Sequence, residues 1–417
     1  MLPIHTQKFK NGLRAVILPN DKAPLVAINL AYKVGSKNET KDMTGIAHLF
    51  EHLMFEGSKH IPKGNFDKYC SMAGGTNNAY TTFDITSYNM TLPKHQLELG
   101  LWLESDRMLE FAVTEESLIT QKKVVSEEIL QTVQNQPYGM WRELLSSTAF
   151  SEDCSYSWEV QGKSSHVMAC TLEYLRSFFA KFYQPDNACL VLCGDLNPEL
   201  TFKMIEKYFA DIPVLNGNQS ISTFSSDFII SGKESEFYDN IPAAGVFLAY
   251  HCPGFTDDDI FKADILSNIF GNGRKSRLYD YLIDDLEIAS HTGSYVDSRE
   301  NASLIIFYAL ASEQNISADE LKEKMIENID EFLTTGLQEK DLEKSINQLT
   351  TRIAYEFQYN ASLADLVAQQ SLFWNDPKRV FKLLDMYKGI NIDDIMVFAN
   401  KIFVKENIIV INALPKH

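Results

Sequence analysis

The stretch Thr44-Gly-Ile-Ala-His-Leu-Phe-Glu-His-Leu-Met-Phe-Glu-Gly57 contains two histidines, His48 and His52, four residues apart. On an α-helix, residues four apart lie one turn above each other, so both imidazoles point toward the same place. Glu51 lies one residue before His52, where its carboxylate could take a proton from a bound water. The spelling His-x-x-Glu-His is one of the zinc peptidase signatures. The stretch therefore predicts a helix in which His48 and His52 bind zinc and Glu51 acts as general base.

A purely structural role for these histidines is the alternative, because two histidines four apart also occur on ordinary polar helix faces. The flanking residues favour a metal. Ile46, Leu49, Leu53 and Phe55 are apolar, which indicates a buried helix. Buried histidine and glutamate side chains need polar partners, and a metal ion would supply one.

Length and composition indicate an ordinary globular chain with more than one domain. The 417 residues exceed what one hydrophobic core usually supports, and the mean hydropathy is -0.18. No apolar run is long enough to span a membrane, and the first residues have no signal-peptide pattern, so we expect a cytoplasmic location and no membrane partner. The six cysteines form no Cys-x-x-Cys pair and are expected to be reduced core residues.

The net charge of -18 bears on the partners of the chain. Nucleic acids and anionic membranes both attract basic surfaces, so neither is expected as a partner. Basic peptides are the favoured class of charged ligand.

Hydrophobic patterns predict an α+β fold made of hairpins and connecting helices. Asn11-Gly12 predicts a tight primed turn between two strands, because this dipeptide tolerates positive φ angles. The metal helix is expected to begin near Thr44, as a cap, and to end at Gly57. Other expected strands and helices are strands at 26–34, 76–82, 87–92 and 188–193, and helices at 66–72, 94–111, 114–133, 137–148, 171–182 and 198–210.

The second half of the sequence repeats the first at an offset near 217 residues, which predicts duplicated domains, each an antiparallel sheet with helices packed on it. Expected boundaries are 1–215 for the metal-bearing domain, 216–234 for a linker and 235–417 for the second domain. In the second copy, the positions of His48, Glu51 and His52 fall on Asp264, Ser267 and Asn268. Only the first domain is expected to carry the metal.

The predicted helix around Lys122-Lys-Val-Val-Ser-Glu-Glu-Ile-Leu130 offers two glutamates, one of which could be the third ligand. Here the chain resembles the M16 (pitrilysin-like, inverzincin) metallopeptidases, the family of insulin-degrading enzyme and mitochondrial processing peptidase. In that family a glutamate follows the histidine motif by some 75 residues, and the resemblance implies Glu128, 76 residues after His52. Glu127 is the rival, but it points about 100° away around the helix. Gly74-Gly-Thr-Asn-Asn-Ala-Tyr-Thr81 and the duplication extend the resemblance to nearly the whole chain.

The resemblance implies a half-clamshell fold, also seen in LuxS-like metallohydrolases, and zinc-dependent hydrolysis of unfolded peptides. It also implies that Asn78 and Ala79 lie on an edge strand that pairs with the substrate backbone, which agrees with the unpaired amides that an edge strand offers. An ordinary hairpin strand is the alternative reading of these two residues.

Two positions depart from the family pattern. Gln121 stands where the family usually has a glutamate that supports the metal ligands, so the chain lacks a charge there. In the second domain, Ile283 and Ser290 stand where the family usually has an arginine and a tyrosine that hold the substrate. Substitutes in the same chain would be Arg274, Arg277 or Tyr295.

The resemblance implies a zinc endopeptidase whose substrate chamber is formed by two chains. The missing arginine and tyrosine favour a heterodimer with a homologous subunit that carries them, and a homodimer is the second choice. A non-catalytic assembly or scaffold subunit is the alternative function, although such members typically lack parts of the zinc motif. A metal-binding structural domain is less favoured, because it would leave Glu51 without a role.

Overall fold

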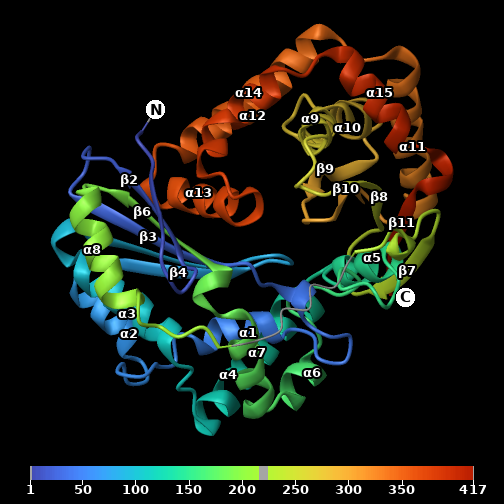
Figure 1. Cartoon of the computed structure of the whole chain (residues 1–417). Coiled ribbons are helices and arrows are strands. Elements are labelled where there is room, and N and C mark those ends of the chain that lie inside the picture. The colour runs from blue at the N-terminus through green and yellow to red at the C-terminus, as the bar shows by residue number, and fades with distance from the viewer. Residues whose placement is uncertain (1, 216–223, 417) are drawn as a thin grey trace. The chain divides into compact units, whose positions relative to one another are not determined.

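The computed structural model describes residues 2–215 and 224–416 and divides into two compact units. Of the described residues, the first unit comprises 2–129, 159–215 and 354–382. The second comprises 130–158, 224–353 and 383–416. Each unit has its own sheet and its own helices, as the ribbon in Figure 1 shows.

The two units are not the continuous segments 1–215 and 235–417 that the sequence suggests. Residues 130–158 pack with the second unit and residues 354–382 with the first. Of the expected linker at 216–234, residues 216–223 lie outside the described residues. Its remaining part joins the second unit, where the Ile230 amide donates a hydrogen bond to the Ala149 carbonyl at 2.9 Å.

A six-stranded sheet forms the centre of the first unit, with strand order β1-β2-β6-β3-β5-β4. All neighbouring pairs are antiparallel except β2 with β6, which are parallel. Strand β4 ends the sheet, with β5 as its neighbour. The strands are β1 His5–Lys8, β2 Arg14–Pro19, β3 Leu25–Tyr32, β4 Thr76–Thr81, β5 Thr86–Pro93 and β6 Ala188–Gly194.

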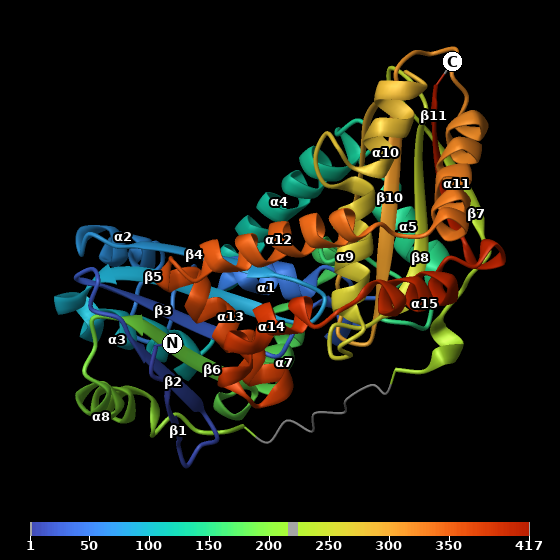
Figure 2. The ribbon, with the colours of Figure 1, turned by 90° about the horizontal axis from the view of Figure 1, so that it is seen from above.

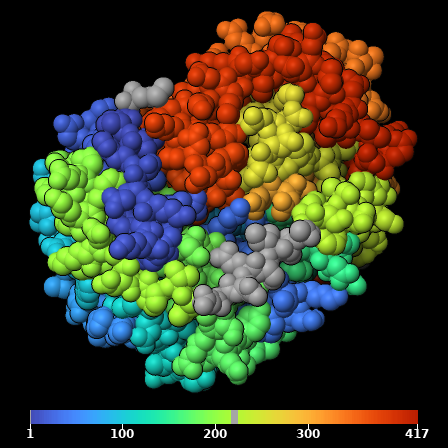
Figure 3. Space-filling model, in the orientation of Figure 1, coloured from blue at the N-terminus to red at the C-terminus, as the bar shows by residue number. Residues whose placement is uncertain are grey.

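Helices pack on both faces of this sheet. Figures 1 and 2 show α13 beside β3 and β6 on one face, while α1, α2 and α3 lie on the other. On the face drawn in Figure 3, the orange-red segment that contains α13 lies against the blue N-terminal strands. The helices of this unit are α1 Ile46–Leu53, α2 Asn65–Met72, α3 Leu97–Leu109, α4 Glu115–Ile129, α6 Ser164–Ala169, α7 Leu172–Phe182, α8 Pro198–Phe209 and α13 Asn360–Trp374.

The second unit contains a five-stranded sheet in the order β7-β11-β8-β10-β9. Strands β11 and β7 are parallel and the other pairs antiparallel, so the order and the place of the parallel pair match β2-β6-β3-β5-β4 of the first sheet. The strands are β7 Glu234–Asp239, β8 Gly245–Pro253, β9 Ala289–Asp297, β10 Ala302–Ala311 and β11 Ile409–Pro415. The helices are α5 Trp141–Ala149, α9 Ile260–Gly271, α10 Arg277–Tyr279, α11 Ala318–Thr335, α12 Glu339–Glu356, α14 Leu383–Lys388 and α15 Ile392–Ile402.

The predicted α+β fold with a duplicated sheet is confirmed, but several local predictions were wrong. Each sheet contains one parallel pair rather than being wholly antiparallel. The hairpin of β1 and β2 forms, yet only Gly12 of its turn has a positive φ angle, 87°, so the turn is not of the primed type. The Asn11 side chain instead donates to the Phe209 and Ile212 carbonyls. Helix α6 was not predicted, and α4 continues as a π-helix over Leu130–Gln134.

Candidate metal centre

Helix α1 brings His48 and His52 together on one side. Their Nε2 atoms are 3.3 Å apart, and the two rings meet edge to face. The opposite side of the helix is buried, and Phe50 stacks on Phe111 and Tyr183. Burial of such an aromatic side chain contributes about 1.5–3 kcal/mol, which fixes the rotation of the helix and hence the direction of both imidazoles.

The start of α1 is held by groups that the sequence pattern did not reveal. The predicted cap, Thr44, does not cap the helix; its hydroxyl contacts His166 Nδ1 at 2.9 Å and accepts from the Lys163 amide. The carboxylate of buried Glu39 accepts hydrogen bonds from the amides of Gly45 and Ala47 instead, at 3.0 and 2.7 Å. An anion at a helix N-terminus is favourable, so Glu39 positions the metal helix.

Gly45 allows the loop before α1 to pack closely on another loop. Its φ angle is 82°, and a Cβ atom there would lie 2.4 Å from the carbonyl oxygen of Gln161. The chain leaves the helix sooner than predicted, because α1 ends at Leu53 and Gly57 lies beyond it, with φ of 133°.

Helix α4 supplies a carboxylate opposite the two imidazoles. Glu128 places its carboxylate oxygens 3.7 Å from His48 Nε2 and 3.4 Å from His52 Nε2. The three potential ligand atoms lie within 4.8 Å of one another, and the described residues contain no other such group of His, Cys, Asp and Glu. Glu127 is exposed and does not belong to this cluster.

The donor set fits a zinc ion. Two imidazole nitrogens and one carboxylate oxygen converge, and catalytic zinc sites usually have three protein ligands of these kinds. The side chains of His48, His52 and Glu128 are 11%, 25% and 35% exposed, so solvent reaches the cluster. Burial lowers the pKa of His48 to about 4, against a smaller raising effect of Glu128, so its imidazole is neutral near pH 7 and can offer a lone pair.

Glu51 lies beside this cluster and touches the edge strand. The Thr81 hydroxyl of β4 donates a hydrogen bond to Glu51 Oε2 at 2.6 Å. Burial raises the pKa of Glu51, while the Thr81 hydrogen bond and His52 lower it. A carboxylate with a raised pKa is a better proton acceptor. Thr81 was not predicted, although it lies two residues after Ala79 and so shares its face of β4.

Gln121 lies on α4, the helix that carries Glu128, and the edge strand β4 contacts α1. Gln121 Nε2 donates to Glu56 Oε1 at 2.7 Å, and Glu56 also pairs with Lys63. Gln121 itself carries no charge, but the side chain that it bonds to, Glu56, is a carboxylate. Asn78 and Ala79 lie on β4, the edge of the sheet, where the Ala79 amide donates to the Asn78 side chain at 2.9 Å.

The positions of the missing arginine and tyrosine lie in the second unit. Ile283 is half-buried in a π-helical turn, and the Ser290 hydroxyl donates to the Leu310 and Ala311 carbonyls, at 3.3 and 3.1 Å. Of the suggested substitutes, Arg274 is exposed, whereas the Arg277 guanidinium lies over the rings of Phe270 and Phe332. Tyr295 lies in β9, and its ring centroid is 5.5 Å from Cζ of the Arg142 guanidinium.

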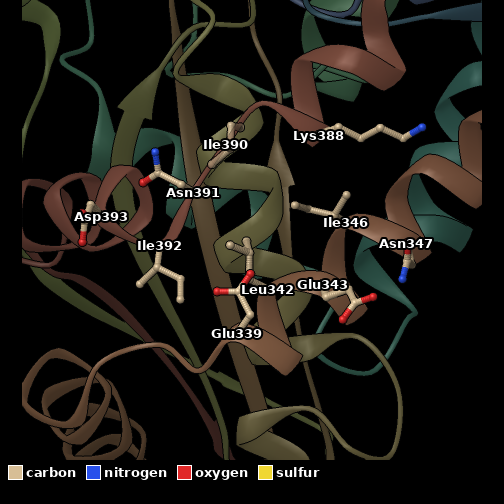
Figure 4. A pocket seen from close by; sticks show the side chains of 10 residues that line it. All are labelled: Glu339, Leu342, Glu343, Ile346, Asn347, Lys388, Ile390, Asn391, Ile392 and Asp393. Carbon is tan, nitrogen blue, oxygen red and sulfur yellow. The ribbon is translucent and has the colours of Figure 1, made fainter.

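The second unit also contains a cavity of about 420 Å³ between α12 and the segment 388–393. Leu342, Ile346 and Ile390 contribute apolar side chains to its wall, and Glu339 and Glu343 carboxylates (Figure 4). No histidine or cysteine lines it, so its chemistry differs from that of the metal centre.

Fold and cluster together define an α+β protein with the ligand set of a zinc peptidase, and comparison with known families agrees. Residues 15–157 match the profile of the insulinase family, peptidase family M16, and residues 169–349 match the profile described as the peptidase M16 inactive domain. The chain belongs to peptidase family M16.

Its relatives include named zinc proteases. Zinc protease PqqE of Helicobacter pylori is 28% identical over 407 residues, covering 96% of this chain and 91% of that protein. The mitochondrial-processing peptidase subunit beta of Neurospora crassa is 23% identical over 427 residues, covering 95% and 84%. Among solved structures, a protease from Helicobacter pylori has a TM-score of 0.91 at 26% identity, with both chains covered completely.

A more distant structure shows the fold alone. The peptidase M16 inactive domain from Pseudomonas fluorescens has a TM-score of 0.89 at 14% identity, covering 100% of this chain and 98% of that one.

Within the described residues, no helix is both long and apolar enough to cross a lipid bilayer.

Proposed function

We propose that this chain is a zinc-dependent endopeptidase that hydrolyses unfolded peptides. The observation that carries the proposal is the convergence of His48, His52 and Glu128 beside Glu51. The naming of relatives as zinc proteases supports the choice of metal. When bound, the zinc ion would make a water molecule acidic and polarise the scissile carbonyl.

The residues of the chain have distinct roles in this reaction. Glu51 accepts the proton of the attacking water and then delivers it to the leaving amine, and Thr81 orients its carboxylate. Strand β4 binds the peptide as an added strand through Asn78 and Ala79. An extended backbone satisfies these contacts, so a folded substrate would have to unfold locally.

The test replaces the base without touching a ligand. Glu51→Gln should abolish hydrolysis of a quenched peptide while the bound zinc, measured by mass spectrometry, stays at the wild-type level. Glu127→Gln is the matched control on exposed α4 surface and should retain both. Normal turnover by Glu51→Gln would refute the assignment of the base.

A scaffold subunit is the second candidate function, because one matching profile carries the description inactive domain. That profile covers residues 169–349, whereas the whole ligand cluster lies before residue 130. Zinc binding by a purified chain that hydrolyses no peptide, alone or with a homologous partner, would favour the scaffold.

The charge of the chain suggests which peptides it prefers. With a net charge of -18, basic peptides should bind better than acidic ones of equal length at low salt. The preference should weaken as salt shortens the Debye length to about 10 Å at 0.1 M. Equal cleavage of both peptides at low salt would remove this part of the proposal.

We also propose a heterodimer with a homologous subunit that supplies the arginine and tyrosine. Ile283 and Ser290 cannot hold a peptide carbonyl as a guanidinium and a phenol can. Activity should therefore be low for this chain alone and rise on addition of the homologous subunit. Full activity of the purified chain by itself would leave a homodimer or monomer as the active form.

A further inference from the structure

Helix α13 contacts strands β3, β4 and β5 of the first unit through the carboxylate of Asp365. Its oxygens accept hydrogen bonds from Asn29 of β3 at 2.9 Å, Ser87 of β5 at 3.0 Å and Gln369 of α13 itself at 3.0 Å. The Tyr80 hydroxyl of β4 lies 2.8 and 2.9 Å from the two oxygens. One side chain is thus bonded to three adjacent strands of the sheet.

Edge strand β4 depends on such contacts more than the inner strands do. Strands β3 and β5 each pair with two neighbours, whereas β4 pairs with β5 over six residue pairs, Thr76 to Thr81. Because an edge strand lacks a second ladder, its position depends on side-chain contacts from its two faces.

Adjacent residues of β4 are held from opposite faces. Tyr80 points toward α13 and bonds to Asp365, whereas Thr81 points toward α1 and bonds to Glu51. Both residues directly follow Asn78 and Ala79. A hydroxyl forms a stronger hydrogen bond with a carboxylate than with a neutral acceptor. The bond from Tyr80 to Asp365 is of this stronger kind.

We infer that Asp365 and Tyr80 are positioning residues that hold β4 in the extended conformation required to add a peptide strand. The inference rests on the proposed peptidase function. It assigns a role in substrate binding to α13, a helix that begins more than 270 residues after the end of β4. The carboxylate already accepts several hydrogen bonds, so it acts through Tyr80 rather than by binding substrate.

The test separates holding β4 from merely docking α13. Tyr80→Phe removes the donor on the edge strand, and Ser87→Ala removes a donor to the same carboxylate from the inner strand β5. Both variants weaken the attachment of α13, but only the first releases β4. Hydrogen exchange of the amides of residues 76–81 should become faster in Tyr80→Phe and stay near wild type in Ser87→Ala.

Peptide kinetics provide a second readout. Tyr80→Phe should raise KM about fivefold or more with kcat within about twofold, since the loss concerns binding and not the base. Asp365→Asn, which keeps the shape and one acceptor, should give a smaller rise in KM. Bound zinc should be unchanged in all three variants.

Two results would overturn the inference. Equal effects of Tyr80→Phe and Ser87→Ala would show that the carboxylate serves only to dock α13. Unchanged exchange of residues 76–81 in Tyr80→Phe would show that β4 needs no such hold. If wild-type protein cleaves no peptide, the proposed function fails, while the exchange measurement still decides this inference.

Discussion

Helix α1 and its duplicate α9 differ in the partners of the polar side chains at equivalent positions. In α1 the imidazoles of His48 and His52 converge with the Glu128 carboxylate of α4. In α9 the position of His48 is taken by Asp264, whose carboxylate accepts a hydrogen bond from the Tyr387 hydroxyl. Burial raises the pKa of Asp264, and Tyr387 and Arg352 lower it.

The two units also differ on the next helix, α4 in the first and α12 in the second. Buried Leu118 and Val125 of α4 correspond to buried Leu342 and Leu349 of α12 at an offset of 224 residues, which puts Arg352 at the place of Glu128. The second unit thus has a positive side chain where the first has the Glu128 carboxylate. Arg352 is exposed and lowers the pKa of Asp264 less than the Tyr387 hydrogen bond does, and a positive charge at this place opposes the binding of a metal cation.

The largest effect is expected when α1 is given the residues of α9. The double variant His48→Asp/His52→Asn should lose bound zinc and lower kcat/KM by about three orders of magnitude or more, because both nitrogen ligands are gone. Zinc content and hydrolysis of the quenched peptide measure this. A variant that keeps both would show that these histidines are not the ligands.

The third ligand should matter next. Glu128→Gln should weaken zinc affinity about a hundredfold, since a neutral amide oxygen replaces a charged ligand, whereas Glu127→Gln should leave it unchanged. Competition with a chelator of known affinity measures the difference. Loss of zinc on mutating Glu127 instead would mean that the helix register is shifted by one residue.

The converse change sharpens the comparison from the other side. Asp264→His/Asn268→His should bind a second zinc ion poorly, because Arg352 repels it. Adding Arg352→Glu should tighten that site about tenfold or more, by replacing a like charge with a ligand. Titration with zinc monitored by calorimetry distinguishes the two variants. Equal affinity in both would contradict the role assigned to Arg352.

The smallest effect concerns backbone conformation. In the first unit, Gly45 and Gly64 have positive φ angles just before α1 and α2, and glycine adopts such angles without strain. In the second unit, Glu287 also has a positive φ angle, 55°, although it carries a side chain. Glu287→Gly should raise the free energy of unfolding by about 0.5 kcal/mol, because relief of the left-handed strain exceeds the entropy cost of glycine. Denaturant unfolding measures it, with exposed Glu313→Gly as control. A loss of stability would mean that Glu287 is not strained.

Much of the site follows from local sequence. The spacing of His48, Glu51 and His52 determines their common side of a helix, because the α-helical repeat is fixed by backbone hydrogen bonds. The choice of Glu128 came from family resemblance, and the observed geometry brings that residue, not Glu127, to the histidines. Repetition of strand and helix patterns predicted the duplicated sheets.

Other features depend on contacts between distant parts of the chain. Nothing near Glu39, Thr81 or Asp365 in the sequence marks them as partners of α1 or β4. The parallel pairs β2–β6 and β7–β11 join strands far apart in sequence, and α13 packs on a sheet whose strands come from the other half of the chain.

The sequence by itself determined the helix period that aligns His48 with His52 and the alternation along β4, because backbone geometry sets both over a few residues. It also determined the duplication, because the same order of strand and helix patterns occurs twice. Only the tertiary structure decided that Glu39 holds the start of α1, that Thr81 touches Glu51 and that Asp365 bonds to Tyr80. Those contacts form when burial brings distant segments together, and the free energy that selects them comes from packing of the whole unit rather than from local propensity.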